Sequence, residues 1–325
     1  MKKKITDLLT STQEHVVMRD YTTFKVGGVA DFFIEVKTID ELIRAVKAAI
    51  RLEMPYFILG NGSNVLFSDY GFAGLVIKNS TSNIAVMKEK SQIIADSGVM
   101  IPKLIMEAIS NDLAGLGFLY GIPGTVGGAV YGNAGAYGAA IGDYVKSLTI
   151  LQIDPEDRIP KVIQQETSWM EFAYRSSKLK ITKSKMKPVI LTVRFQFSRN
   201  QKEELMRRLN KYQKERVEHQ PIGLSAGCVF KNPIPLELKN ITGAGTKGMP
   251  ELPKERTAGF MLEKSGVKKL RIGNAEVSDK HANFIINHDS AKANEIRSLI
   301  EVMREKVREK FDVILEEEIE YIGQW

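Results

Sequence analysis

The chain contains one cysteine, Cys228, and this scarcity excludes two kinds of protein. A single thiol can form neither a disulfide framework nor a cysteine-based zinc site, and it is typical of a reducing compartment. The sequence also lacks an apolar run near the ~20 residues of a membrane span. No apolar segment follows the basic start, as a signal peptide requires. We therefore expect a soluble, cytoplasmic protein.

Common nucleotide-binding signatures are missing as well. The sequence has no G-x-G-x-x-G that follows a strand and opens a helix, and no G-x-x-x-x-G-K-[ST]. A dinucleotide would therefore be held by a fold other than the Rossmann fold or the P-loop. No His, Asp or Glu cluster has metal-ligand spacing, so we expect no metal site.

The net charge of +7 favours an anionic partner. Nucleic acid would need clustered basic residues with aromatic residues among them, and no such module is present. The one dense basic run, residues 178–187, lacks aromatic residues and is interpreted as a solvated loop. The charge is better explained by a positive field that steers an anionic small molecule.

Periodicity predicts a mixed α+β chain. The pair Thr38 and Glu41 forms a capping box that opens a helix through Ile50, between strands at 31–36 and 56–59. Pro102 suits the first turn of another helix, and Asn200 precedes a charged helix that ends near 218 and could link two domains. An amphipathic helix is expected around 296–307. Further strands are expected at 75–77, 93–95, 148–153, 189–197 and 313–322.

Eight glycines lie between Gly121 and Gly142, and Gly60 to Asn64 form a second glycine-rich loop after a strand. Glycines allow main-chain N–H groups to point together at an anion and allow a flat ring to approach the backbone. Either loop alone could be a tight turn, since turns also favour Gly and Asn. Two such loops on αβ segments favour a large diphosphate ligand.

These loops and several other motifs resemble the UDP-N-acetylenolpyruvoylglucosamine reductase family. The glycine loops alone would indicate only the wider vanillyl-alcohol-oxidase-like, PCMH-type flavin fold. The motifs around Arg175, Cys228 and Glu318 narrow the resemblance to the reductases, and the absence of a tyrosine-bearing insertion resembles their type II form. The motifs occur in family order over residues 20–323; they are Phe24–Gly28, Gly60–Asn64, Gly121–Gly128, Asn133–Gly138, Tyr174–Ser177, Ser225–Pro233, Lys280–Asn287 and Leu315–Glu318.

The resemblance implies a two-part FAD-binding region, residues 1–80 and 81–199, and an α/β substrate domain, residues 200–325, whose last strand, 313–323, returns to the active site. It implies that NADPH reduces non-covalent FAD, which reduces UDP-N-acetylglucosamine enolpyruvate to UDP-N-acetylmuramate for peptidoglycan synthesis, and hence a role in cell-wall biogenesis, cell shape and division. None of the four histidines lies in a glycine loop, so a histidyl-linked flavin is not expected. A monomer is compatible with the sequence.

By the same resemblance, three residues carry the reaction: Arg175 and Glu318 as clamp and electrostatic organiser, and Cys228 as the acid that protonates the substrate carbon. The residues themselves leave other interpretations open. A free cysteine is usually a small buried hydrophobe, and Arg175 could cap a turn. Glu316, Glu318 and Glu320 share one face of the expected strand and could form a solvated edge.

The remaining implied contacts belong to the cofactor and to the rest of the substrate. Tyr174, Lys231 and Asn232 are expected at the substrate, whereas a contact from His219 or Arg216 stays open. Two alternatives remain: an oxidase of the same fold acting on a hydroxy acid or alcohol, and a non-catalytic flavin or nucleotide-sugar binder. The expected FAD contacts are Thr22, Thr23, Gly60, Asn61, Gly62, Ser63, Asn64, Gly121, Ile122, Pro123, Gly124, Thr125, Gly127, Gly128, Asn133, Ala134 and Gly135.

Overall fold

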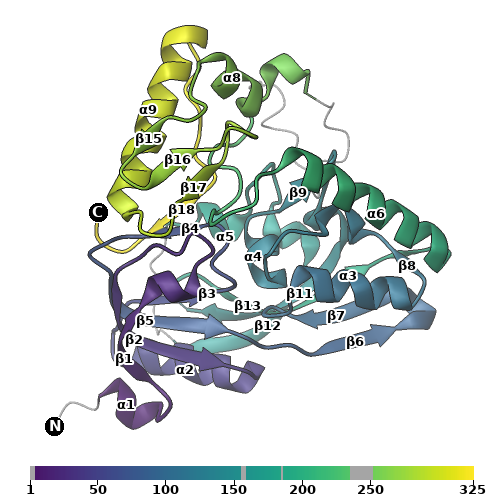
Figure 1. Cartoon of the computed structure of the whole chain (residues 1–325). Coiled ribbons are helices and arrows are strands. Elements are labelled where there is room, and N and C mark those ends of the chain that lie inside the picture. The colour runs from purple at the N-terminus through teal and green to yellow at the C-terminus, as the bar shows by residue number, and fades with distance from the viewer. Residues whose placement is uncertain (1–3, 155–158, 184–185, 235–251) are drawn as a thin grey trace.

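The first of the two larger β-sheets, which has four strands, lies near the N-terminus (Figure 1). The computed structural model describes residues 4–154, 159–183, 186–234 and 252–325. In this sheet β2, β5 and β3 run parallel, and β1 pairs antiparallel at one edge. The strands, in sheet order, are β1 (Gln13–Val17), β2 (Val29–Val36), β5 (Phe72–Asn79) and β3 (Tyr56–Leu59).

Helix α2 (Ile39–Arg51) packs between this sheet and the second one. The predicted capping box is confirmed, because Thr38 Oγ1 accepts the Glu41 N–H at 3.2 Å while Glu41 accepts the Thr38 N–H. Its apolar face shares one core with strands of both sheets, including Leu75 of the first and Leu151 of the second. Burying that face on two sides fixes the sheets relative to each other.

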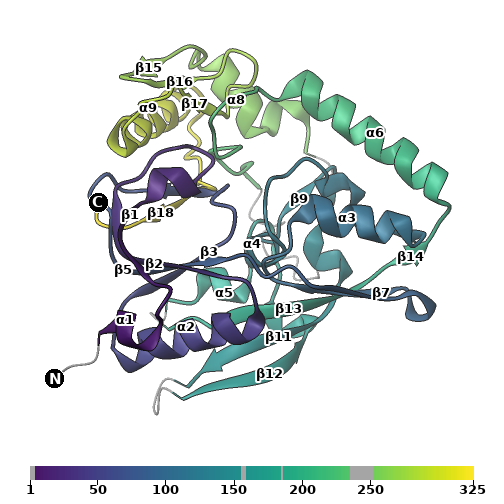
Figure 2. The ribbon, with the colours of Figure 1, turned by 60° about the horizontal axis from the view of Figure 1, so that its bottom comes forward.

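The second sheet is antiparallel throughout, in the order β12-β11-β13-β7-β6. Helices α3 and α6 lie side by side over one of its faces (Figure 2), and the short helix α4 packs into the same core. Pro102 occupies the first turn of α3, as predicted. The bounds are β12 (Pro160–Glu166), β11 (Val145–Ile153), β13 (Val189–Gln196), β7 (Gln92–Asp96), β6 (Ile84–Met87), α3 (Ile101–Ser110), α4 (Val126–Tyr131) and α6 (Lys202–His219).

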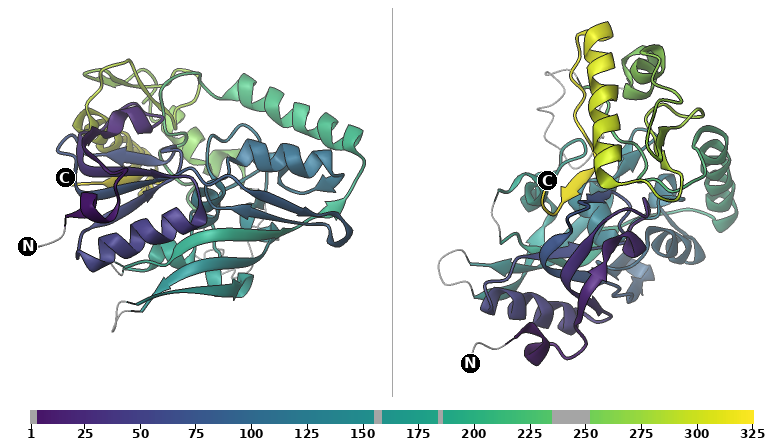
Figure 3. Two further views of the ribbon diagram at one scale, coloured as in Figure 1. Left: turned by 90° about the horizontal axis from the view of Figure 1, so that it is seen from below. Right: turned by 60° about the vertical axis from the view of Figure 1, so that its left-hand side comes forward.

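The C-terminal part forms a separate layer that rests on the first sheet. Helix α9 (Ala293–Phe311) stands at the end of the molecule opposite α1 (Figure 3), and its predicted apolar face is buried. Asp69 fastens this layer, because its carboxylate accepts the N–H groups of Ala293 and Asn294 at 2.8 and 3.1 Å. The other elements of the layer are α8 (Ala258–Lys264), β15 (Arg271–Ile272), β16 (Ala275–Val277) and β17 (Ile285–Asn287).

Short elements complete the described chain. They are α1 (Ile5–Leu8), β4 (Val65–Phe67), β8 (Leu113–Ala114), β9 (Gly135–Ala136), β10 (Ala139–Ala140), α5 (Lys178–Ile181), β14 (Ser198–Arg199) and β18 (Glu320–Ile322). Within the described ranges, no helix is long and apolar enough to cross a membrane, and no group of three or more His, Cys, Asp or Glu is arranged to hold a metal.

Two predicted boundaries are wrong. The strand expected at 313–322 is reduced to β18, which pairs in parallel with β4. Leu315 and Ile319 are buried in the core of the C-terminal layer, and the segment then reaches β4, which lies outside the first sheet. Helix α6 begins at Lys202 with Gln201 as its N-cap, one residue after the expected cap Asn200, whose side chain accepts the Gln201 N–H at 2.8 Å. Most of the 234–255 insertion lies outside the described residues.

Candidate active site

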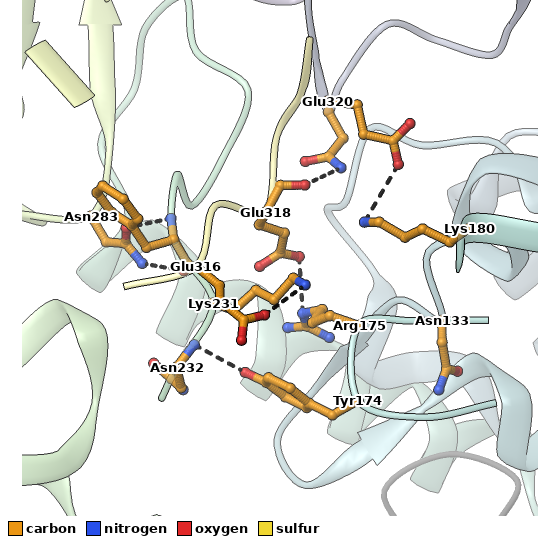
Figure 4. A network of polar contacts seen from close by, with 12 residues as sticks. Asn133, Tyr174, Arg175, Lys180, Lys231, Asn232, Asn283, Glu316, Glu318 and Glu320 are labelled. Atoms are coloured by element: carbon orange, nitrogen blue, oxygen red, sulfur yellow. Dashed lines mark hydrogen bonds and ion pairs between the residues drawn. The ribbon is translucent and has the colours of Figure 1, made fainter. Parts of the chain in front are cut away.

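Three segments from distant parts of the chain meet where the C-terminal layer faces the second sheet. They carry Arg175 just before α5, Cys228 after α6, and Glu318 just before β18. Arg175 Nε lies 2.9 Å from Glu318 Oε1, and the two side chains are only 19% and 22% exposed (Figure 4). Partial burial strengthens such a pair, because solvent screens it less.

The Arg175 loop is a tight, fastened turn. Arg175 has a left-handed φ of +51°, and Ala173 and Ser176 exchange two main-chain hydrogen bonds across it. Asn133 Nδ2 donates to the Ala173 carbonyl at 2.8 Å. A Cβ on Gly135 would lie 3.0 Å from Arg175 Nη1. Gly135, predicted at the cofactor, therefore leaves room for the guanidinium of Arg175.

Cys228 lies beside this ion pair, and its surroundings keep it a thiol. The Glu318 N–H donates to the Val229 carbonyl at 2.7 Å, so the segment of Glu318 runs next to Cys228. Burial and, to a smaller extent, the Glu318 carboxylate raise the pKa of Cys228 to about 12, against the lowering influence of Arg175 and Arg216. The thiol is therefore protonated at neutral pH and can donate a proton.

The last segment is only partly a solvated edge, because the side chain of Glu316 is 59% exposed whereas those of Glu318 and Glu320 are 22% and 25% exposed. Each of the three carboxylates on the expected face has its own cation: Glu316 pairs with Lys231 at 3.4 Å, Glu318 with Arg175 at 2.9 Å, and Glu320 with Lys180 at 3.4 Å (Figure 4). These cations come from three separate segments. Local periodicity contains no information about such partners.

The interpretation of the basic run at 178–187 as a solvated loop is wrong for Lys180 and Lys187. Lys178 to Ile181 form helix α5, capped by Ser177. Lys180 is only 17% exposed in its pair with Glu320, and Lys187 Nζ donates to the Tyr131 hydroxyl at 3.2 Å. Lys183 is exposed, and residues 184–185 lie outside the described residues. The prediction failed for Lys180 and Lys187 because tertiary packing covers their stems, which a charge count does not reveal.

Arg216 approaches the cluster, and sequence reasoning left its role open. Its Nη2 donates to the Phe118 carbonyl at 3.0 Å, and its guanidinium lies 5.9 Å from the centre of the Tyr137 ring. It borders a groove of about 300 Å³. His219 turns back on its own helix, where Nδ1 contacts the Glu215 carbonyl at 2.8 Å. Both side chains line this groove, and only Arg216 also acts electrostatically on Cys228, so Arg216 is the better candidate for a ligand contact.

The two glycine-rich loops pack against each other. Asn61 Nδ2 donates to the Pro123 carbonyl at 2.7 Å. A Cβ on Gly60 would lie 2.5 Å from Thr125 Oγ1, and one on Gly62, where φ is +64°, would lie 2.3 Å from the Tyr21 carbonyl oxygen. Both glycines are therefore required by close approach of the backbone.

Both loops contain main-chain N–H groups that have no partner among the described residues. In the second loop Gly127 donates to the Ser97 carbonyl at 2.7 Å, and Gly128 donates to Thr125 Oγ1 at 3.3 Å, which caps α4. These two groups are therefore already engaged within the protein. Among the described residues, the N–H groups of residues 61–63 in the first loop, and those of Gly121 and Gly124 in the second, have no acceptor. Each loop therefore keeps N–H groups that suit an anion.

The other predicted cofactor contacts fall into two groups, since some lie at the first loop and others are engaged elsewhere in the protein. Thr23 Oγ1 donates to the Gly62 carbonyl at 3.3 Å and lies at the first loop. Thr22 is buried and bonds to the Val26 carbonyl at 3.1 Å, and Asn133 uses its amide on Ala173 and Gly142. Asn64 Nδ2 donates to the Glu318 carbonyl at 3.0 Å. The first loop therefore contacts the segment that carries Glu318.

The predicted substrate contacts lie together on the other side of Arg175. The Tyr174 hydroxyl accepts the Asn232 N–H at 3.3 Å, while Asn232 Oδ1 accepts the Ala258 N–H at 3.0 Å and so orders the start of α8. The Arg175 guanidinium lies 5.3 Å from the centre of the Tyr174 ring. The side-chain oxygen of Asn232 therefore already accepts one hydrogen bond within the protein.

Comparisons with known proteins agree with this arrangement. A family profile described as "FAD binding domain" matches residues 30–156, and one described as "UDP-N-acetylenolpyruvoylglucosamine reductase, C-terminal domain" matches residues 219–322. The chain is 38% identical to the UDP-N-acetylenolpyruvoylglucosamine reductase of Caldicellulosiruptor saccharolyticus, over 95% of this chain and 91% of that protein. It is 35% identical to that of Clostridium novyi, over 100% of this chain and 97% of that protein.

A solved structure matches over the whole fold. The reductase (MurB) of Thermus caldophilus superimposes with a TM-score of 0.73 at 31% identity, over 95% of this chain and 98% of that one. The match extends over the FAD-binding region and the C-terminal layer, so it includes all three segments of the candidate site. The chain therefore belongs to the UDP-N-acetylenolpyruvoylglucosamine reductase family.

Proposed function

We propose that this chain uses NADPH and FAD to reduce UDP-N-acetylglucosamine enolpyruvate to UDP-N-acetylmuramate, a step of peptidoglycan synthesis. The observation that carries the proposal is the convergence of Arg175, Cys228 and Glu318, from three distant segments, in a chain collinear with reductases over its length. A cation, a protonated acid and a carboxylate are the groups that this reaction requires.

The residues of the paired loops fit a flavin dinucleotide. Close packing leaves no room for a side chain at Gly60 or Gly62, and residues 61–63 offer N–H groups suited to a diphosphate. Thr23 and Asn61 fix this loop from either side. When bound, FAD supplies the hydride that it has received from NADPH.

Arg175 and Glu318 would hold the reacting end of the substrate. Hydride addition to the enolpyruvyl methylene places negative charge on the adjacent carbon and its carboxylate. The guanidinium of Arg175 presents a planar fork that suits this carboxylate. Glu318 orients Arg175 through the 2.9 Å ion pair, and the fastened loop keeps the guanidinium in place before the substrate arrives.

Cys228 would donate the proton that completes the reaction. Because its pKa is raised to about 12, the thiol carries its proton throughout the neutral range. The proton passes from Sγ to the carbon adjacent to the carboxylate, and the thiolate left behind is stabilised by Arg175 and Arg216. A hydroxyl at this position could serve the same purpose.

Positive side chains would hold the remainder of the substrate. Lys231 pairs with Glu316, and Arg216 borders the groove and acts electrostatically on Cys228. Both are placed to contact the diphosphate of a nucleotide sugar, and Tyr174 lies beside Arg175 to pack against the sugar or lactyl part. The net charge of +7 would steer this anionic substrate to the protein.

An NADPH oxidation assay with purified FAD-loaded protein tests the proposal. Oxidation that depends on UDP-N-acetylglucosamine enolpyruvate is the expected result. Oxygen consumption without an NADPH requirement would instead identify an oxidase of the same fold. Protein that binds FAD and the nucleotide sugar but never oxidises NADPH would identify a non-catalytic binder.

A further inference from the structure

A second ion pair joins the Arg175 loop to the last segment of the chain. Lys180 Nζ lies 3.4 Å from Glu320 Oε1, and the two side chains are 17% and 25% exposed. Lys180 lies on α5, shortly after Arg175 in the sequence, and Glu320 is the first residue of β18, shortly after Glu318. Figure 4 shows the two pairs bridging the same two segments at neighbouring points.

Glu320 is also tied to the element behind the loop. The Tyr131 hydroxyl lies near Glu320, because burial and the Glu320 carboxylate both raise the pKa of Tyr131. Lys187 Nζ donates to the same hydroxyl at 3.2 Å and to the Lys180 carbonyl at 3.3 Å. Glu320 therefore pairs with Lys180 close to Tyr131, in a network largely covered from water.

The loop itself is fastened through the same residues. Ser177 Oγ donates to the Tyr131 carbonyl at 2.6 Å, directly after the turn that carries Arg175. On the other segment, the Glu320 N–H donates to the Asn64 carbonyl at 3.0 Å, and Asn64 also holds the Glu318 carbonyl. The carboxylate of Glu320 thus connects the Arg175 loop, which Ser177 fastens, to the last segment, which Asn64 fastens.

We propose that Glu320, through its ion pair with Lys180, is a positioning residue that keeps the Arg175 loop in register with Glu318 during turnover. A substrate carboxylate that binds Arg175 competes with Glu318 for the guanidinium, so the first ion pair weakens when it is needed for alignment. The second pair does not contact that carboxylate and maintains the alignment. The effect on turnover rests on the proposed function, whereas the effect on the loop does not.

The test compares Glu320→Gln, Lys180→Met and the double variant with a matched control, Lys178→Met. Lys178 pairs with Glu171 at 2.8 Å on the outer side of the same loop, where it does not reach the last segment. Amide hydrogen exchange of residues 173–181 should become roughly tenfold faster in the first three variants and stay unchanged in the control. The double variant should exchange no faster than Glu320→Gln alone, because Lys180 contributes to this network only through Glu320.

Stopped-flow measurements give the catalytic counterpart. We expect flavin reduction by NADPH to be unchanged, and reoxidation by the enolpyruvyl substrate to be about tenfold slower, in Glu320→Gln and Lys180→Met. Unchanged exchange in the loop, or equal slowing of both half-reactions, would overturn the proposal. If wild-type protein shows no reoxidation by this substrate, the proposed function fails while the exchange data still decide the positioning role. If Glu320→Gln does not fold, Lys180→Arg, expected to keep wild-type exchange, replaces it beside Lys180→Met.

Discussion

The glycine loops and the Arg175–Cys228–Glu318 cluster adjoin each other, yet they are formed by different kinds of chemical groups. The loops depend on main-chain groups and on the absence of side chains at Gly60 and Gly62. The cluster depends on side chains brought together by tertiary contacts. Changes in the loops should therefore act on cofactor retention and stability, and changes in the cluster should act on single chemical steps of an intact flavoprotein.

The strongest contrast should come from Arg175→Met. Removing the guanidinium takes away the group that would hold the substrate carboxylate and leaves Glu318 without its ion pair. We expect reoxidation of the flavin by the enolpyruvyl substrate to fall about 10²–10³-fold, with FAD content and reduction by NADPH unchanged. Stopped-flow absorbance of the flavin measures both steps. An equal loss in both would show that Arg175, like the glycine loops, affects the bound cofactor and not a single chemical step.

Gly62→Ala should lower stability and FAD retention, in contrast to Arg175→Met, which should slow one chemical step. The new Cβ would lie 2.3 Å from the Tyr21 carbonyl oxygen at a φ of +64°. We expect a loss of about 1–3 kcal/mol in the free energy of unfolding and weaker FAD retention, measured by thermal unfolding and by flavin fluorescence after gel filtration. Gly138→Ala is the control, because Gly138 has a φ of +72° but no atom within 4 Å of its Cβ position. Equal losses in the two variants would contradict the role of close approach.

A smaller effect is expected where the two loops touch each other. Asn61→Ala removes the 2.7 Å hydrogen bond to the Pro123 carbonyl. We expect a loss of about 0.5–1.5 kcal/mol in stability and several-fold weaker FAD binding, followed by titration of the apoprotein. Unchanged FAD affinity would show that the two loops bind their ligand independently.

The smallest effect is a predicted absence of pH dependence. A thiol donates its proton only below its pKa, and the pKa of Cys228 is raised to about 12. The rate of flavin reoxidation by substrate should therefore be flat between about pH 6 and 9, whereas an ordinary thiol would lose its proton near pH ~8.5. A fall in this rate with a midpoint near that value, absent from Cys228→Ser, would contradict the raised pKa.

Local sequence signals predicted the framework of both regions. Thr38, Pro102 and the apolar spacing of α9 each report on hydrogen bonds or packing within a few residues, and all three predictions are confirmed. The glycine loops were found for the same reason, since glycine is required where the backbone itself makes the contact.

Long-range pairing could not be predicted in this way. Glu316, Glu318 and Glu320 look alike in the sequence, and only the folded chain gives them Lys231, Arg175 and Lys180 as separate partners. The same limit explains why the sequence of α6 did not reveal that Arg216, and not His219, acts electrostatically on Cys228. A partner that arrives from another segment leaves no local pattern.

The most direct test of the account is the fate of the reduced flavin in Cys228→Ala. We predict that this variant binds FAD and is reduced by NADPH at the wild-type rate, and that its reoxidation by UDP-N-acetylglucosamine enolpyruvate is at least about 100-fold slower. Cys228→Ser should restore much of the lost rate, because its hydroxyl also carries a transferable proton. Reoxidation of Cys228→Ala at the wild-type rate would show that Cys228 is not the acid.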